Sequence, residues 1–406
     1  MLRPGLRSRA DFARLWLGRH WKVAVALLVF VAGAVVYVEP ASALPIAILS
    51  AIAGVITLIA DTLAARDEAR ELQVVAAGPR DLSALEASPA YAGARVERVQ
   101  DAHLLRDPNV DAALPGLATT LRVNRPAHDV PPELADIQLA VVRHFRQAGS
   151  LVFNGSAVRL ETDLGYPAVA QTITTGAPLT VEVRETPFFA ALATNEVTDL
   201  RIVSRRTRRE IVDGLALLAS RHGVIRDLSQ SWLANVIGIS TLAVTSDDHL
   251  LVVQQTARNA ASPGRAAPSG SGSVDERDLK GAGDLAGMVI AAMERELREE
   301  CNLPASIPIA TRLTGFARWL ERGGKPEFFG VSRIGVRARE VEQRRVAASE
   351  RAYVGIVHAL ELAPLVASPT PAFPTQLGVP SVPLAAALDC LERARAVNRS
   401  VLDELV

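Results

Sequence analysis

The stretch that most constrains the fold runs from Glu294 to Leu303 and reads ERELREECNL. In a helix, Glu296, Glu299 and Glu300 stand at positions i, i+3 and i+4, so their carboxylates share one face. Such crowded carboxylates repel one another unless solvent, arginine or a hard divalent cation offsets their charge. The other face carries an apolar stripe of Ile290, Met293, Leu297 and Cys301. The pattern predicts a helix that begins near Ala286, packs on a core and carries its chemistry on the opposite face.

The commonest meaning of such a helix is a solvated face with Glu–Arg pairs. The segments before it favour a more specific interpretation. Residues 249–255 predict a strand, and the glycine-rich residues 264–273 predict a loop. An acidic turn, Asp275 to Asp278, then leads to the helix.

Strand, glycine-rich loop, acidic turn and an Arg-Glu-Leu-x-Glu-Glu helix, in this order, resemble the Nudix box. The matching residues are the helical half and the leading glycine: Arg295, Glu296, Leu297, Glu299, Glu300 and Gly272. The resemblance implies that Glu296, Glu299 and Glu300 bind Mg²⁺ or Mn²⁺ at a diphosphate. It also implies that Arg295 orients these carboxylates, which makes all four residues candidates for the catalytic site.

The sequence departs from the family pattern at several positions. Asp275 and Asp278 stand where glutamates are usual, and Asn302 stands where glycine is usual. Residues 279–287 lengthen the loop before the helix.

Residues 313–331 predict a strand, a turn and a second strand, and they resemble nucleotide-sugar diphosphatases of the same family. This resemblance makes Arg318, Lys325 and Glu327 candidates for contact with a phosphate or the metal. Phe328 is a candidate for stacking on a base, although packing in the core is the commoner role of such an aromatic. With Gly272, these residues form the predicted nucleotide-binding set.

Two runs near the N-terminus, residues 23–38 and 40–60, contain no charged residue. Each is about long enough to cross a hydrocarbon core of ~30 Å. A signal peptide cleaved after Ala43 is the alternative. Basic residues precede the first run and follow the second, which predicts a multi-pass protein of the bacterial inner membrane with both termini in the cytoplasm.

The predicted fold class is a two-helix transmembrane hairpin followed by an α+β Nudix fold, with a mixed sheet between helices and an extra α+β segment before it. The segments are a basic N-terminus (1–22), two transmembrane helices (23–61), a stalk and linker (62–130), the accessory segment (131–225) and the Nudix-like domain (226–406). Within the accessory segment we expect a helix over 131–148, a hairpin turning at Asn154-Gly155, a strand over 179–183 and a basic helix from Arg201 to Leu218.

The charge balance and the cysteines exclude some classes of partner and site. The chain of 406 residues has 44 basic and 44 acidic side chains, so a general attraction to duplex nucleic acid is not indicated. Its two cysteines, Cys301 and Cys390, supply neither a disulfide framework nor a zinc set.

Two functions follow from these features. The architecture is similar to membrane effectors of bacterial cyclic-oligonucleotide antiphage signalling (CBASS). This similarity implies a nucleotide or cyclic-oligonucleotide ligand, contact with a lipid bilayer and a homo-oligomer formed through the spans. The alternative is a membrane-anchored, Mg²⁺-dependent hydrolase of nucleoside diphosphate-linked substrates. A scaffold with an inert Nudix fold is a third possibility.

Overall fold

The structure is a computed structural model that describes residues 4–19, 71–78, 80–128, 130–256, 264–346, 354–366, 373–374 and 377–405. The two uncharged runs, 23–38 and 40–60, lie outside these residues, as do residues 62–70 of the predicted stalk.

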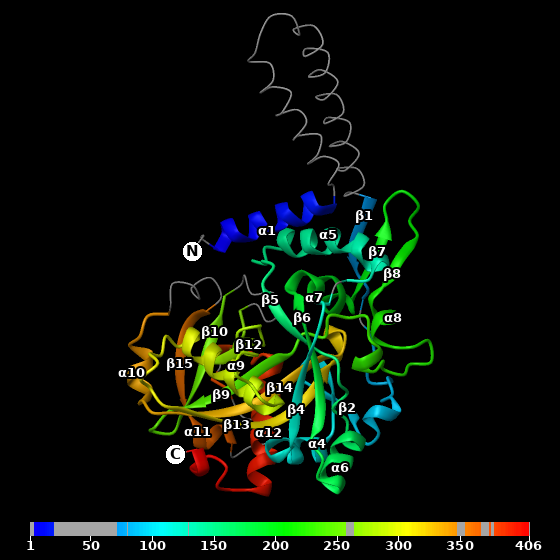
Figure 1. The fold of residues 1–406 in the computed structure, drawn as a ribbon. Helices are drawn as coiled ribbons and strands as arrows, with labels where there is room; N and C mark the ends of the chain where they lie inside the picture. The colour runs from blue at the N-terminus through cyan, green and yellow to red at the C-terminus, as the bar shows by residue number, and fades with distance from the viewer. Residues whose placement is uncertain are drawn as a thin grey trace, which may run out of the picture.

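A nine-stranded mixed sheet forms the centre of the molecule (Figure 1). Its path runs β11-β10-β9-β14-β13-β3-β2, while β12 pairs with β9 and β15 pairs with β10. The pairing of β9 with β14 is parallel and the other pairings are antiparallel. The strands are β2 (Arg95–Val99), β3 (Ala102–Arg106), β9 (Gly238–Val244), β10 (His249–Gln255), β11 (Ala266–Pro268), β12 (Gly270–Ser273), β13 (Ile309–Trp319), β14 (Lys325–Ile334) and β15 (Val354–Glu361).

Helices α9 (Leu285–Glu300) and α12 (Val382–Val397) pack on this sheet through two separate apolar clusters. Met288 and Met293 of α9 share one cluster with Phe328 of β14. The next residue of that strand, Phe329, joins Leu388 of α12 in the other. Because successive side chains of a strand point to opposite faces, the two helices cover opposite faces of the sheet. The chain therefore has a mixed α+β fold with a curled mixed sheet, as predicted in outline.

Two further three-stranded sheets lie outside the main sheet; with the helices that pack on them, they are called the accessory part. One has the order β1-β7-β8 and the other has the order β4-β6-β5. Their strands are β1 (Leu72–Ala76), β7 (Leu200–Ser204), β8 (Glu210–Asp213), β4 (Thr119–Asn124), β6 (Leu179–Pro187) and β5 (Ser156–Leu160). The remaining α-helices are α1 (Pro4–Arg19), α4 (Pro108–Ala113), α5 (Pro132–Gln147), α6 (Tyr166–Thr175), α7 (Phe188–Thr194), α8 (Gly214–Leu218), α10 (Ala338–Glu342) and α11 (Leu362–Val366).

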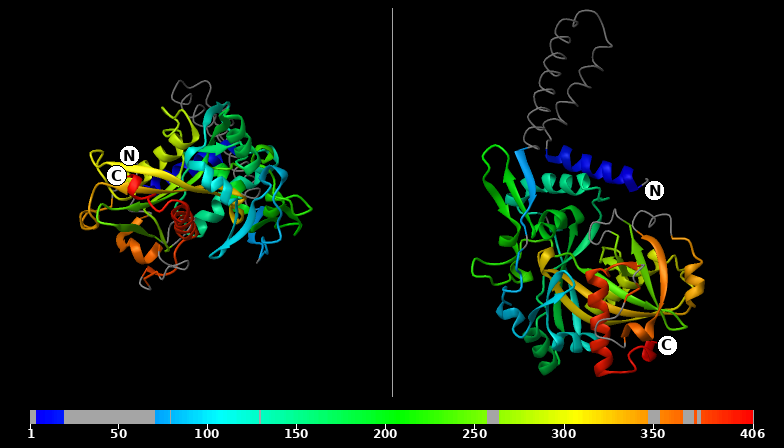
Figure 2. Two further views of the ribbon diagram at one scale, coloured as in Figure 1. Left: turned by 90° about the horizontal axis from the view of Figure 1, so that it is seen from below. Right: turned by 180° about the vertical axis from the view of Figure 1, so that it is seen from behind.

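Helix α1 lies across α5 at one end of the molecule, and both are seen there in the opposite views of Figures 1 and 2. The nearly buried carboxylate of Asp11 in α1 accepts a hydrogen bond of 3.0 Å from the backbone N–H of Asn154. The guanidinium of Arg146 in α5 stacks over the ring of Phe12. These contacts hold α1 against the accessory part.

The accessory part confirms some predicted elements and corrects two. Helix α5 matches the helix predicted over 131–148, and β6 contains the predicted strand 179–183. The hairpin at Asn154-Gly155 is wrong, because β5 pairs with β6 and the Asn154 side chain instead accepts a hydrogen bond from Phe189 N. The basic helix from Arg201 is also wrong. Residues 200–213 form the antiparallel strands β7 and β8, in which Ile202 pairs with Val212, and β-branched residues favour strands.

Strands β2 and β3 lie within the predicted linker but extend the main sheet. Arg106 of β3 pairs with Ala317 of β13. Residues before 131 therefore contribute to the same sheet as residues after 226. The exact domain boundaries stay a prediction.

None of the helices in the described ranges combines the length and apolar character that crossing a bilayer requires. This finding contradicts the predicted multi-pass inner-membrane location and the resemblance to membrane effectors of antiphage signalling. Both predictions are wrong. Residues 23–61, which carried them, fall among the residues that the structure does not describe.

Candidate functional site

The acidic stretch forms the C-terminal half of α9, as predicted. The helix begins after Asp284, whose side chain accepts a hydrogen bond of 2.7 Å from Gly287 N. Met293 and Leu297 are fully buried, and Cys301 directly after the helix is nearly so. The apolar stripe thus anchors the helix on the sheet, which leaves the carboxylates of the other face toward the loop that precedes the helix.

Arg295 is the centre of that acidic face. Its Nε and Nη2 atoms each donate to one carboxylate oxygen of Asp278 at 2.8 Å. Nη2 also donates to the carbonyl of Ser273 at 3.1 Å, and Nη1 donates to Glu296 at 2.7 Å and to Glu299 at 3.5 Å. Burial alone would lower the pKa of Arg295, but Asp278 and Glu296 raise it above its ordinary value. One charged side chain therefore ties the loop to the helix.

The three glutamates are not equivalent. The side chains of Glu296 and Glu299 are 16% and 37% exposed, and both contact Arg295. Glu300 is buried, and its Oε2 accepts a hydrogen bond of 3.4 Å from Ser271 N in β12. The structure thus brings Glu296 and Glu299 together at Arg295, while Glu300 faces the neighbouring strand.

The glycine-rich residues 264–273 were predicted as a loop, which is wrong, because they contain the paired strands β11 and β12. Within β12, Gly272 gives α9 room to approach. A Cβ atom at this position would lie 2.5 Å from the carboxyl carbon of Glu296. Any other residue would displace that carboxylate. The leading glycine of the predicted box therefore has a steric reason to be glycine.

The loop between β12 and α9 holds a second arginine that the sequence analysis did not single out. Asp275 accepts hydrogen bonds of 2.7 Å from the backbone N and from Nε of Arg277. Nη1 of Arg277 then reaches Oε1 of Glu299 at 3.4 Å. Burial opposes ionisation of Asp275, yet its hydrogen bonds from Arg277 lower its pKa. The sequence did contain a signal for this contact, namely the spacing of Asp275 and Arg277 in a predicted turn. An Asp side chain in a turn often accepts a hydrogen bond from the backbone N–H two residues further along the chain.

The β4-β6-β5 sheet of the accessory part holds this loop at both ends. At its start, Val158 N in β5 donates to the carbonyl of Val274 at 2.9 Å. At its end, Leu121 N in β4 donates to the carbonyl of Gly283 at 3.4 Å, and Leu285 N donates to Oγ1 of Thr119 at 2.9 Å. The predicted loop extension over residues 279–287 is too long, because α9 begins at Leu285, and the end of the loop is docked on β4 through Gly283.

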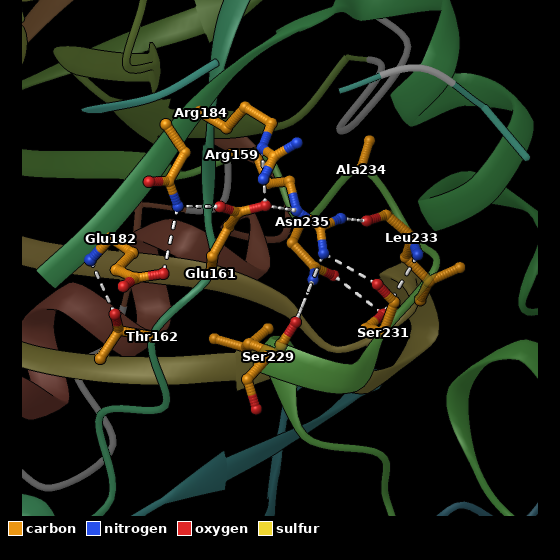
Figure 3. A network of polar contacts seen from close by, with 12 residues as sticks. Arg159, Glu161, Thr162, Glu182, Arg184, Ser229, Ser231, Leu233, Ala234 and Asn235 are labelled. Atoms are coloured by element: carbon orange, nitrogen blue, oxygen red, sulfur yellow. Dashed lines mark hydrogen bonds and ion pairs between the residues drawn. The ribbon is translucent and has the colours of Figure 1, made fainter. Parts of the chain in front are cut away.

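A buried arginine holds β5 in turn (Figure 3). Arg159 is 4% exposed, and its guanidinium donates to the carbonyls of Ser231 and Leu233. Its Nε donates to Glu161 at 3.2 Å, and Arg184 contacts the same carboxylate at 3.0 Å. This network joins β5, β6 and the segment before β9. It therefore fixes the position of β5, the strand that contacts the start of the loop between β12 and α9.

The donor set on α9 suits a divalent cation in its chemistry, because Mg²⁺ and Mn²⁺ prefer carboxylate oxygens. The carboxylate of Glu296 already fills the space beside Gly272. Within the described ranges, however, no three His, Cys, Asp or Glu side chains gather closely enough to hold a metal ion. Arg295 and Arg277 instead neutralise Glu296 and Glu299.

The other predicted nucleotide-binding residues are buried away from solvent. Phe328 packs against Phe316 with ring centroids 4.9 Å apart. Arg318 is 1% exposed, donates to the carbonyl of Gly324 at 3.1 Å and stacks over Tyr91. These contacts give Arg318 and Phe328 roles in packing, and their roles in ligand binding stay predictions.

Lys325 and Glu327 form a buried ion pair with each other on β14. Arg322 lies 3.8 Å from Glu327 and also pairs with Glu196 of the accessory part. Gly238 on the adjacent strand leaves space for this pair, since a Cβ there would clash with both side chains. A ligand-binding role for Lys325 and Glu327 remains a prediction.

No protein-family model and no curated protein matches the chain. Several solved structures are similar to part of the chain, and two of them illustrate the similarity. The first is DR0079 of Deinococcus radiodurans, with 16% identity over 38% of this chain and 80% of that chain, at a TM-score of 0.26. The second is a Nudix hydrolase of M. smegmatis, RenU, with 14% identity over 40% of this chain and 86% of that chain, at a TM-score of 0.25. TM-scores of this size do not assign the chain to a family.

Proposed function

We propose that the chain is a Nudix-like hydrolase that cleaves a diphosphate linkage of a nucleotide substrate in a divalent-cation-dependent reaction. The observation that supports this most directly is the two-pronged contact of Arg295 with Asp278. It joins the loop between β12 and α9 to the helix. Arg295 also contacts Glu296 and Glu299, and the carboxylate of Glu296 lies against Gly272 of β12.

Each residue of the cluster has a definable task in this proposal. Glu296, Glu299 and Glu300 would supply the oxygen ligands for Mg²⁺ or Mn²⁺. Arg295 keeps Glu296 and Glu299 oriented, and Asp278 keeps Arg295 oriented. A bound cation would neutralise charge on a diphosphate and make an attacking water more acidic.

The ion pairs of Glu296 and Glu299 with arginine affect how a cation could bind to these carboxylates. Three carboxylates on one helix face repel one another, so the two arginines stabilise the cluster while no cation is bound. A cation must therefore compete with Arg295 and Arg277 for the oxygens of Glu296 and Glu299.

The test is incubation with a panel of nucleoside diphosphate-linked compounds and Mg²⁺, with chromatography of the nucleotides formed. We expect release of a nucleoside monophosphate, its loss on chelation of the cation, and a fall of at least about tenfold in rate for Glu299→Gln. Glu294→Gln is the matched control, since Glu294 lies on the same helix and interacts with Thr311 rather than with Arg295. Equal rates for the wild type and Glu299→Gln would overturn the proposal.

A further inference from the structure

The turn between β7 and β8 concentrates positive charge in a chain whose charges otherwise balance. Residues 205–209, called the arginine turn, read RRTRR, and the whole chain has equal numbers of basic and acidic side chains. All five residues of the turn are exposed. Ser204 pairs with Leu72, the first residue of β1, so the arginine turn follows at the end of the molecule that carries α1 (Figure 1).

The arginine turn has little compensating negative charge. Arg206 lies 4.0 Å from Glu71, and its side chain is 83% exposed, so this pair contributes little. Arg205, Arg208 and Arg209 have no carboxylate partner among the residues that the structure describes. Four like charges within five residues repel one another, which destabilises the hairpin.

The backbone holds the arginine turn in a single shape. The N–H of Arg205 donates to the carbonyl of Glu71 at 2.8 Å, and the N–H of Arg208 donates to the carbonyl of Ser204 at 2.9 Å. The N–H of Thr207 donates to Oγ of Ser204 at 3.0 Å. Arg208 has a φ of 59°, in the left-handed region that favours glycine. An arginine at this position therefore carries backbone strain that glycine would avoid.

The charge repulsion and the backbone strain both oppose folding, and no contact within the described residues offsets them. Positions that break local rules in this way without a structural gain are candidates for function. The planar guanidinium of arginine donates paired hydrogen bonds to phosphate oxygens, so several guanidinium groups on one fixed turn suit a ligand with more than one negative charge. Residues 200–213 contain no aromatic side chain that could stack on a base, which favours recognition of the phosphate itself.

We propose that the arginine turn is a binding site for multivalent phosphate, supplied either by a soluble oligophosphate or by a lipid headgroup. This site is separate from the acidic face of α9, and the proposal does not depend on the proposed hydrolase function. Arg206 and Arg208, on either side of Thr207, would supply donors from both sides of the turn.

The test uses the full chain in a chelator, so that a cation-dependent site does not contribute. Isothermal titration calorimetry with inorganic tripolyphosphate tests the soluble source, and cosedimentation with phosphatidylcholine vesicles with and without phosphatidic acid tests the headgroup. We expect the wild type to bind at least one phosphate probe. The Arg206→Ala, Arg208→Ala double variant should bind that probe at least about tenfold more weakly. Arg95→Ala, Arg98→Ala is the matched control, because both arginines are exposed on β2 and the net charge changes equally.

Arg208→Gly separates binding from folding. Glycine relieves the left-handed backbone, so this variant should unfold at a higher temperature than the wild type and yet bind the phosphate probe at least about threefold more weakly. The proposal is overturned if the wild type binds neither probe, or if the control loses as much affinity as the double variant. Binding of polyglutamate as tight as that of tripolyphosphate would overturn it as well, since the site would then recognise negative charge in general.

Discussion

Arg295 on α9 and Asp278 in the preceding loop are 17 residues apart in sequence and share two hydrogen bonds of 2.8 Å. Both side chains are shielded from solvent, with exposures of 15% and 3%. Their pairing converts the loop and the helix into one unit and determines where Glu296 can lie.

Removing one member of this pair should cost more than removing an exposed ion pair. Arg295→Ala leaves the buried carboxylate of Asp278 without its cation, so we expect a loss of about 2–4 kcal/mol in the free energy of unfolding. Urea denaturation measures this loss. A double-mutant cycle with Asp278→Asn should show strong coupling between the two positions. Additive losses would show that the pair is not the link between loop and helix.

Gly272→Ala should impair the site without unfolding the chain. The added Cβ falls 2.5 Å from the carboxyl carbon of Glu296, so that carboxylate must move. We expect a loss of at least about tenfold in cation-dependent hydrolysis. Gly283→Ala, in the loop between β12 and α9, is the control, because a Cβ there meets no atom within 4 Å. Equal activity of the two variants would show that the position of Glu296 is unimportant.

Thr119→Val tests whether the β4-β6-β5 sheet supports the start of α9. The substitution keeps the shape of the side chain but removes the acceptor of the Leu285 N–H, which is buried. An unpaired buried donor costs about 1–2 kcal/mol, and hydrogen exchange at Leu285 should become faster. Thr120→Val, at the exposed neighbouring position, should leave that exchange rate unchanged. Unaltered exchange in Thr119→Val would mean that the sheet does not hold the helix there.

Asp111 should make stability depend on pH. Burial raises the pKa of Asp111 to about 6, although Arg106 lies beside it. Its pKa in the unfolded chain is about 3.9, so the folded state binds the proton more tightly. Protonation of Asp111 therefore stabilises the folded state. This stabilisation is complete below the pKa of Asp111 in the unfolded chain and is lost as the pH rises through its pKa in the folded protein.

Asp111→Asn cannot take up this proton. Relative to the variant, the wild type should therefore be more stable at pH 4.5 than at pH 7, by about 1–2 kcal/mol in the free energy of unfolding. Denaturant titrations of both proteins at the two pH values measure the difference. A constant difference across this range would contradict the raised pKa.

The sequence predicted the acidic helix and the central strands because their signals are local. The period of Met293 and Leu297 identified the buried face of α9, and the apolar run of residues 249–255 predicted the strand β10. The leading glycine was also identified, and the close approach of Glu296 supplies its physical reason.

What the sequence did not reveal depends on contacts between distant segments. Nothing near Thr119 indicates that its hydroxyl accepts a hydrogen bond from Leu285, 166 positions away. Arg318 and Phe328 resembled ligand-binding residues, yet long-range packing buries both. The basic stretch from Arg201 was predicted as a helix because its charges obscured the alternation that forms β7 and β8.

The most direct test of the central claim is an electron paramagnetic resonance titration with Mn²⁺, which counts bound cations without any substrate. We predict that the wild type and Glu294→Gln bind Mn²⁺ with equal affinity. The Glu296→Gln, Glu299→Gln double variant should lose this binding by at least about tenfold. Equal Mn²⁺ binding in the double variant and the wild type would contradict a cation site on this face of α9.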